Sequence, residues 1–205
     1  MQKLFFILSI LFLFINNIIH AQSEHNRAII NAEESVVGAS RTELYLPILQ
    51  NKRVGIIANQ TSIFSDTHLV DTLLKLEIDI KAIFTPEHGF RGSADEGTFI
   101  ANSIDEKTKL PIISLYGSNK KPNKEQLKDI DILLFDLQDV GTRFYTYIST
   151  MTYIMEAAAE NDIPVIVLDR PNPNGFYIDG PIMEDENTSF VGLHHIPIVY
   201  GMTIG

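Results

Sequence analysis

Residues 54–84 read VGIIANQTSIFSDTHLVDTLLKLEIDIKAIF, and this stretch decides the fold class. It opens on a continuous apolar run, residues 54–58, which is typical of a strand covered on both faces. Residues 67–76 then carry leucine and valine at helical spacing, with Ser65 or Asp66 as the expected N-cap. Residues 78–84 alternate between apolar and polar side chains and predict a second strand. A strand, a helix and a strand in this order predict a parallel βαβ unit.

The same alternation continues on both sides of that unit. Residues 22–52 predict a lead-in helix or two, and residues 123–130 and 145–161 predict two later helices. Strands are expected at residues 112–116, 132–137 and 165–168. We therefore expect an α/β fold of the Rossmann-like kind, a largely parallel sheet with helices on both faces. From Pro171 the chain becomes irregular and rich in Gly and Pro, and we expect it to be truncated before a smaller C-terminal domain.

The first 21 residues are typical of a targeting segment. Lys3 precedes an apolar run of residues 4–15, which is short for a membrane-spanning helix, and small Ala21 follows a polar stretch. We expect a signal peptide over residues 1–21, with an uncleaved membrane anchor as the alternative. Residues 22–205 would then form one exported domain, periplasmic or extracellular, with no stable membrane insertion after cleavage.

Composition and charge exclude several classes of function. The 205 residues include 26 acidic and 16 basic ones, a formal net charge of −10, which disfavours nucleic acid as a partner. The chain has no Cys, so disulfides, thiolate nucleophiles and Cys-based metal sites are excluded. His194 and His195 have no third ligand spaced near them and are expected to be a surface pair, so we predict no metal.

Polar side chains follow the predicted strands at the point where each strand ends. In open α/β sheets, ligands bind beyond the carboxyl ends of the strands. The side chains expected at this edge are Asn59, Glu87, His88, Asp136, Asp139, Arg143, Asp169 and Arg170. Carboxylates, a histidine and guanidinium groups at one edge suit acid–base chemistry on a polar substrate. The structural alternative is that Asp and Asn here cap helices or form Asx turns.

The motifs of other chemistries are missing. No G-x-G-x-x-G follows the first strand, and no phosphate-binding G-x-x-x-x-G-K-[ST], G-x-S-x-G elbow or H-E-x-x-H occurs anywhere in the chain. These absences disfavour dinucleotide binding, nucleotide phosphoryl transfer, a serine triad and a metalloprotease site. Carboxylate-driven chemistry is the class that is left.

Seven sequence blocks, in one order, resemble a known family. They are FTPEHGFRG (84–92), SLYG (114–117), FDLQDVGTRFYTYISTM (135–151), VLDRPNPNG (167–175), GP (180–181), SFVG (189–192) and GMTIG (201–205). Together they resemble the NamZ-type exo-β-N-acetylmuramidases, over roughly residues 35–205. The resemblance implies a glycoside hydrolase that releases N-acetylmuramic acid from the non-reducing end of peptidoglycan fragments. It also implies a Rossmann-like N-terminal domain, with peptidoglycan-derived disaccharides or muropeptides as partners and no cofactor.

The resemblance also implies roles for the carboxylates. Glycoside hydrolysis usually needs two carboxyl groups, one to protonate the leaving oxygen and one to assist attack. Glu87 matches the Glu of the family's PEHG block and is the predicted general acid, with His88 as its orienting partner or a sugar ligand. The second carboxylate is predicted to be Asp139 or, failing that, Asp169, with Asp136 as a buried support.

Binding of the sugar is assigned to arginine, tyrosine and asparagine side chains. A guanidinium suits the lactyl carboxylate of muramic acid, which makes Arg91, Arg143 and Arg170 candidates. The structural alternative is that two of these three arginines neutralise neighbouring acids. Tyr145 or Tyr147 is predicted to stack on the sugar or bond its N-acetyl group. The full predicted substrate-binding set is Asn59, Arg91, Asp136, Arg143, Tyr145, Tyr147, Arg170 and Asn172.

Two other functions compete with the hydrolase. An exported, non-catalytic binding protein for muropeptides or other anionic sugars would use the same arginines and tyrosines. An NAD-dependent glycosidase would fit the fold class, although the missing glycine motif counts against it.

Overall fold

The computed structural model describes residues 36–87, 89–92 and 102–205, and the predicted signal peptide lies outside these residues. Residues 36–205 form one compact unit. Its centre is a six-stranded sheet with the order β5-β6-β4-β1-β7-β8. The strands are β1 (Val54–Ala58), β4 (Ile80–Thr85), β5 (Ser103–Ile104), β6 (Pro111–Ser114), β7 (Ile132–Asp136) and β8 (Val165–Val167).

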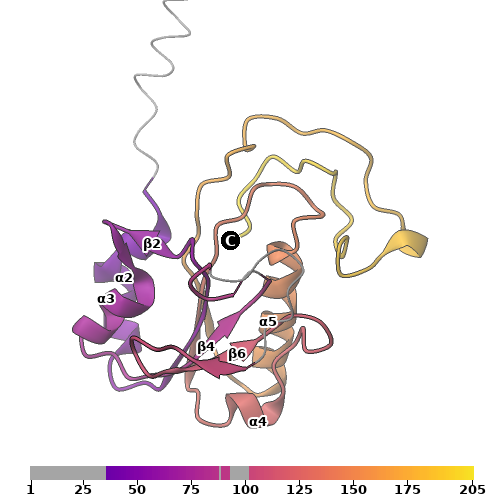
Figure 1. Cartoon of the computed structure of the whole chain (residues 1–205). Helices are drawn as coiled ribbons and strands as arrows, with labels where there is room; N and C mark the ends of the chain where they lie inside the picture. Colours follow the sequence, from indigo (N-terminus) through magenta and orange to yellow (C-terminus); the bar gives the residue numbers. More distant parts are fainter. Residues whose placement is uncertain (1–35, 88, 93–101) are drawn as a thin grey trace, which may run out of the picture. The chain divides into compact units, whose positions relative to one another are not determined.

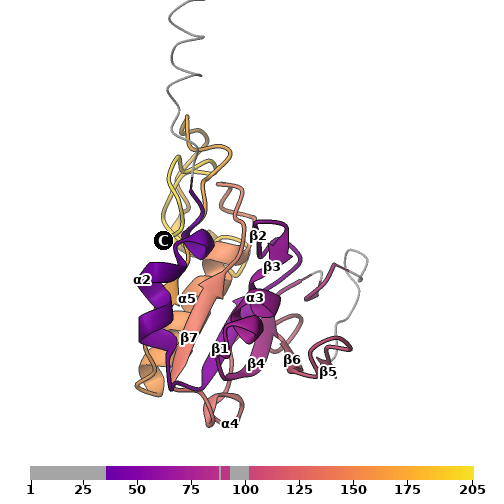
Figure 2. The ribbon, with the colours of Figure 1, turned by 90° about the vertical axis from the view of Figure 1, so that its left-hand side faces the viewer.

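The sheet is parallel except at one edge. β1 pairs in parallel with β4 on one side and with β7 on the other, β4 pairs with β6, and β7 pairs with β8. Only β5, which the sequence did not predict, runs antiparallel, beside β6. Figure 2 shows β7, β1, β4, β6 and β5 side by side in this order. The chain thus builds one half of the sheet outward from β1 and then returns to build the other, which confirms the Rossmann-like prediction.

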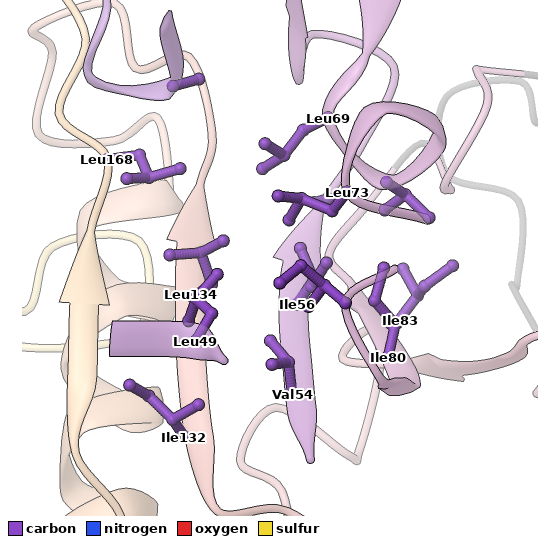
Figure 3. Packing of buried hydrophobic residues seen from close by; sticks show 14 of the residues in the cluster. Leu49, Val54, Ile56, Leu69, Leu73, Ile80, Ile83, Ile132, Leu134 and Leu168 are labelled. Carbon is purple, nitrogen blue, oxygen red and sulfur yellow. The ribbon is translucent and has the colours of Figure 1, made fainter. Parts of the chain in front are cut away.

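Helices cover both faces of the sheet, and its central strands are therefore buried along their whole length. On one face, α2 (Thr42–Leu49) and α3 (Leu69–Lys75) pack with Leu49, Leu69 and Leu73 against one set of strand side chains. Figure 3 shows the side chains of this layer packed beside Val54, Ile56, Ile132 and Leu134 of the two central strands. On the other face lie α4 (Lys124–Leu127) and α5 (Tyr147–Glu160), packed on Ile57, Phe84, Leu133 and Phe135. Figure 1 shows α3 and α5 on opposite sides of β4.

The prediction of a helix from residue 67 with Ser65 or Asp66 as its cap was wrong. Both residues have positive φ, 47° and 61°, and form the two-residue turn of a hairpin between β2 (Ile63–Phe64) and β3 (Thr67–His68). Two successive positive φ angles are the backbone of a type I′ hairpin turn. Helix α3 therefore begins at Leu69, and its N-cap is His68, whose Nδ1 accepts a hydrogen bond from the Val70 amide.

The chain beyond β8 lies over the carboxyl ends of the strands without joining the sheet. Residues 171–205 contain one short 3-10 helix, η2 (Asp185–Asn187), as the irregular composition predicts. A second 3-10 helix, η1 (Gly38–Ser40), precedes α2. Isolated bridges join Val199 to Thr142 and to Asp179. Within the described part of the chain, no helix combines the length and apolar character needed to cross a membrane.

Candidate functional site

Glu87 lies in a pocket of about 230 Å³ at the carboxyl ends of β4 and β6. The turn after β4 contributes Pro86 and Glu87 to it, and the segment after β6 contributes Leu115, Tyr116 and Lys120. The pocket is completed by α5 and the residue before it, and by a turn far along the chain: Thr146, Thr150, Phe190 and Val191. A carboxylate thus lies in a small cavity at the edge of the sheet where the fold is expected to bind ligands.

Two phenol groups lie close enough to feel the charge of Glu87. That charge raises the pKa of the Tyr116 phenol, and loss of hydration and a hydrogen bond between the two side chains add to the effect. Burial raises the pKa of Tyr147, with contributions from Tyr145 and from Glu87. The Tyr145 and Tyr147 rings meet edge to face at 4.7 Å. Both Tyr116 and Tyr147 therefore keep their protons at neutral pH and can donate hydrogen bonds.

Asn59, a predicted sugar ligand, instead fixes the position of Tyr147. It is fully buried at the end of β1, and its Nδ2 donates to the Tyr147 hydroxyl at 2.7 Å. Its Oδ1 accepts hydrogen bonds from the Thr61 amide and hydroxyl, and its carbonyl bonds His68 Nε2 at 2.8 Å. With these partners, Asn59 connects the end of β1 to the tyrosines beside Glu87.

Asp136 and Arg170 bind each other at the end of β7. The guanidinium makes two bonds to the carboxylate, Nε to Oδ1 at 2.6 Å and Nη2 to Oδ2 at 3.0 Å. Asp136 is fully buried and Arg170 nearly so, and Nη2 also donates to the Ile63 carbonyl in the β2–β3 hairpin. This geometry is that of a structural ion pair, and a role of either residue as a substrate ligand stays a prediction.

Asp139 is a buried carboxylate with one oxygen bound and one free. Its Oδ2 accepts hydrogen bonds from the Gly141 amide at 2.7 Å and from the Tyr200 hydroxyl. Its Oδ1 is buried and has no hydrogen-bond partner among the described residues. Burial raises the pKa of Asp139, although the bonds from Tyr200 and Gly141 oppose the shift. The lining of the Glu87 pocket, as far as the structure describes it, does not include Asp139.

Asp169 and Asn172 hold segments of backbone together. Asp169 Oδ1 accepts from the amides of Arg170 and Gly205. Asn172 Nδ2 donates to the Met202 carbonyl, and its Oδ1 accepts from the Asn174 amide. Neither residue lines the Glu87 pocket in the part of the chain that is described, and their roles in catalysis and sugar binding stay predictions.

Arg91 lies in an acidic setting on the other side of β4. Its guanidinium bonds Asp105 twice, at 2.7 and 2.8 Å, and Asp71 of α3 at 3.2 Å. Lys107 adds a 2.6 Å bond to Asp71. The Arg91 guanidinium, together with the amide and hydroxyl of Thr108, holds the pKa of Asp105 well below its usual range. His88, the predicted partner of Glu87, lies outside the described residues.

Arg143 holds the segment that carries Phe190. Its Nη1 donates to the carbonyls of Pro181, at 3.1 Å, and Ile196, and it is almost fully buried. The imidazole of His194 lies 3.0 Å from the Thr152 hydroxyl on α5. Residues 181–196 are therefore held at two points, by Arg143 in the loop before α5 and by Thr152 on α5, and this places Phe190 and Val191 in the wall of the pocket.

The structure thus groups some of the predicted residues and separates others. Asn59, Tyr147 and Tyr145 form one contiguous set close enough to Glu87 for its charge to act on Tyr147, while Asp136–Arg170, Asp139–Tyr200 and Arg91–Asp71–Asp105 form three others. Tyr116 and Lys120 were not among the predicted site residues. The available signal was their position in the segment that follows β6, since residues after a parallel strand lie at the same edge as Glu87.

A parallel sheet of this order with a carboxylate pocket at its carboxyl edge defines a Rossmann-like domain suited to acid–base chemistry. Within it, residues 54–205 match the family described as exo-beta-N-acetylmuramidase NamZ, N-terminal. The chain belongs to this family.

Its relatives include one of named activity. The chain is 55% identical over 164 residues to peptidoglycan beta-N-acetylmuramidase NamZ of Bacillus subtilis (strain 168), covering 78% of this chain. Crystal structures of two DUF1343 family proteins of Bacteroides fragilis NCTC 9343 share the fold, each with a TM-score of 0.75. They are 47% and 44% identical, over 84% and 82% of this chain. The chain spans only 40% of the length of the Bacillus protein, and 45% and 43% of the two Bacteroides chains.

Proposed function

We propose that this chain carries the acid–base site of an exo-acting glycoside hydrolase. The enzyme would release N-acetylmuramic acid from the non-reducing end of peptidoglycan-derived disaccharides or muropeptides. The observation that carries the proposal is the Glu87 carboxylate in its pocket, in a chain of this family. The named activity of the Bacillus relative supports the substrate class.

In the proposed reaction, Glu87 protonates the glycosidic oxygen as the bond to the anomeric carbon breaks. A water molecule supplies the hydroxyl that ends on that carbon, either directly or after a covalent intermediate. Tyr116, which lines the same pocket, is the side chain that would orient the Glu87 carboxyl group. Asp139 and then Asp169 stay the predicted second carboxylates. The pocket volume of about 230 Å³ suits one sugar unit at the end of a chain, which agrees with exo action.

The test is Glu87→Gln in the full-length protein, assayed on a chromogenic β-N-acetylmuramide and on the matching β-N-acetylglucosaminide. We expect release from the muramide by the wild type and a loss of at least 100-fold in kcat for the variant, as is typical of a missing general acid (~10²–10⁴). Glu106→Gln, an exposed carboxylate outside the pocket, is the matched control.

Other outcomes are equally informative. Unchanged release by Glu87→Gln would keep the hydrolase and discard Glu87 as its acid. Binding of muramic acid without release by either protein would favour the exported binding protein.

We also propose that the protein is exported, on the composition of residues 1–21. The expected mature N-terminus is close to Gln22, and mass spectrometry of the protein from the cell envelope or medium measures it. A chain that keeps residues 1–21 and stays in the membrane fraction would contradict the proposal.

A further inference from the structure

A second charged side chain, Lys120, lies in the wall of the pocket that holds Glu87. It follows β6 in a segment whose shape is fixed locally, since Asn119 Nδ2 donates to the Ser114 carbonyl at 2.8 Å. A cation and a carboxylate thus come to one small cavity from the ends of two neighbouring strands, β6 and β4.

The ammonium group of Lys120 is held in place by an aromatic ring. Its Nζ lies over the Phe190 ring, 4.3 Å from the centroid, a cation–π contact. Phe190 is in turn fixed, because Ser189 and Gly192 exchange two backbone hydrogen bonds across a tight turn. The Tyr153 ring of α5 packs on Phe190 with centroids 5.5 Å apart. Much of the entropy cost of ordering the lysine is therefore met before any ligand binds.

Lys120 also differs from the other candidate cations in its partners. Arg91 and Arg170 are each bound by carboxylates, and Arg143 is bound by backbone carbonyls. The next residue, Lys121, pairs with Glu156 and Glu160 of α5. Lys120 makes no ion pair within 4.0 Å to any acidic residue that the structure describes. The pocket therefore contains a positive charge that can pair with an anionic group of a bound ligand.

We propose that Lys120 recognises the carboxylate of the substrate's terminal sugar and so determines specificity for muramic acid. The inference rests on the proposed function for the identity of that sugar. N-acetylmuramic acid differs from N-acetylglucosamine by a lactyl ether that ends in a carboxylate. An ammonium fixed in the pocket distinguishes the two sugars through a charge-assisted hydrogen bond. This assigns to Lys120 the role that the sequence had suggested for the three arginines.

The experiment compares Lys120→Met with Lys121→Met, a matched control that removes the neighbouring charge outside the pocket. Equilibrium binding of N-acetylmuramic acid and of N-acetylglucosamine is measured by calorimetry for each full-length protein, and kcat/KM on the chromogenic muramide is measured alongside. We expect Lys120→Met to weaken muramic acid binding about 10- to 100-fold and to leave N-acetylglucosamine binding unchanged. Lys121→Met is expected to bind both sugars as the wild type does, and Lys120→Arg to recover part of the loss.

The outcomes separate this inference from the proposed function. Wild-type binding that depends on Lys120, without any hydrolysis, would uphold the inference and overturn the hydrolase. Equal losses for both sugars, or no difference between the two methionine variants, would overturn the role of Lys120 whether or not the protein hydrolyses muramides. Failure of the wild type to bind muramic acid would overturn it as well.

Discussion

At the scale of single residues, the Glu87 carboxylate has a phenol beside it that the surrounding charge keeps protonated. Tyr116 lines the same pocket as Glu87, and its pKa is raised chiefly by the charge of that carboxylate, so its hydroxyl lies where it can donate to the carboxyl group. We predict that Tyr116→Phe lowers kcat on the muramide about tenfold, the usual effect of losing one hydrogen bond to a charged group, with KM little changed. Initial rates measure it, and Tyr177→Phe, at a phenol outside the pocket, is the control. Equal rates for wild type and Tyr116→Phe would remove Tyr116 from the site.

Asp139 predicts a pH dependence of stability. Burial raises its pKa in the folded protein, so the native carboxyl keeps its proton at a pH where the unfolded one, near 3.9, has lost it. The unfolded state then binds fewer protons, and stability falls as pH rises through that window. Asp139→Asn has no carboxyl group at this position, so its stability does not fall in this way. The free energy of unfolding of the variant should therefore rise relative to that of the wild type as pH increases above about 4.

The measurement is urea unfolding at several pH values from 4 to 7. Asp169→Asn is the comparison, since that carboxylate is less buried and contacts backbone amides. Parallel stability curves for Asp139→Asn and wild type would show that the Asp139 side chain ionises as easily in the folded state as in the unfolded one.

The site was only partly predictable from these residues. Glu87 was identified because it follows a strand and matches the Glu of the PEHG block in the family that the sequence resembles. The partners of the arginines were not, because Asp71 and Asp105 are 20 and 14 residues from Arg91, and Asp136 is 34 residues from Arg170. Such pairs form through tertiary packing, which cannot be predicted from residue type and local spacing alone.

At the scale of elements, Arg91 joins α3 to the chain around β5. Its removal would leave Asp71 and Asp105, both buried, without the guanidinium that they share. We predict that Arg91→Met lowers the free energy of unfolding by about 1–3 kcal/mol, the cost of leaving a buried polar group unpaired, because Arg91 itself is partly exposed and Lys107 still binds Asp71. Urea unfolding measures the loss. Arg53→Met, which breaks more exposed pairs with Asp129 and Asp131, should cost clearly less, and an equal cost would contradict the argument.

Local patterns predicted the main strands and helices but failed at two short elements. The β2–β3 hairpin was mistaken for a helix start because Ser and Asp are common both as N-caps and in turns. β5 has only two residues, both exposed, and therefore carries neither an apolar run nor an alternation. In contrast, the core strands were found because burial on both faces requires a continuous apolar run.

At the scale of the whole domain, the strand order is Rossmann-like, but the connection after β1, where such folds usually bind a nucleotide, is built differently. In dinucleotide-binding folds, a glycine-rich turn leads from the first strand straight into a helix N-terminus. Here the β2–β3 hairpin lies between β1 and α3, and the His68 side chain caps that helix. We predict that millimolar NAD leaves the melting temperature unchanged, whereas N-acetylmuramic acid raises it by mass action. Differential scanning fluorimetry measures both, and a rise with NAD would restore the NAD-dependent glycosidase.

The Asp136–Arg170 pair has a consequence for how this fold changes over evolution. It occupies the carboxyl end of β7, next to β1, where the strand order reverses and comparable sheets receive their cofactors. Replacing either member alone leaves the other as a bare charge in the interior, at a cost of about 3–5 kcal/mol. A cofactor site cannot evolve at this position by one neutral substitution at a time, because both residues must change together. New activities in descendants of this domain should therefore arise by altering the walls of the Glu87 pocket, two strands away from Asp136.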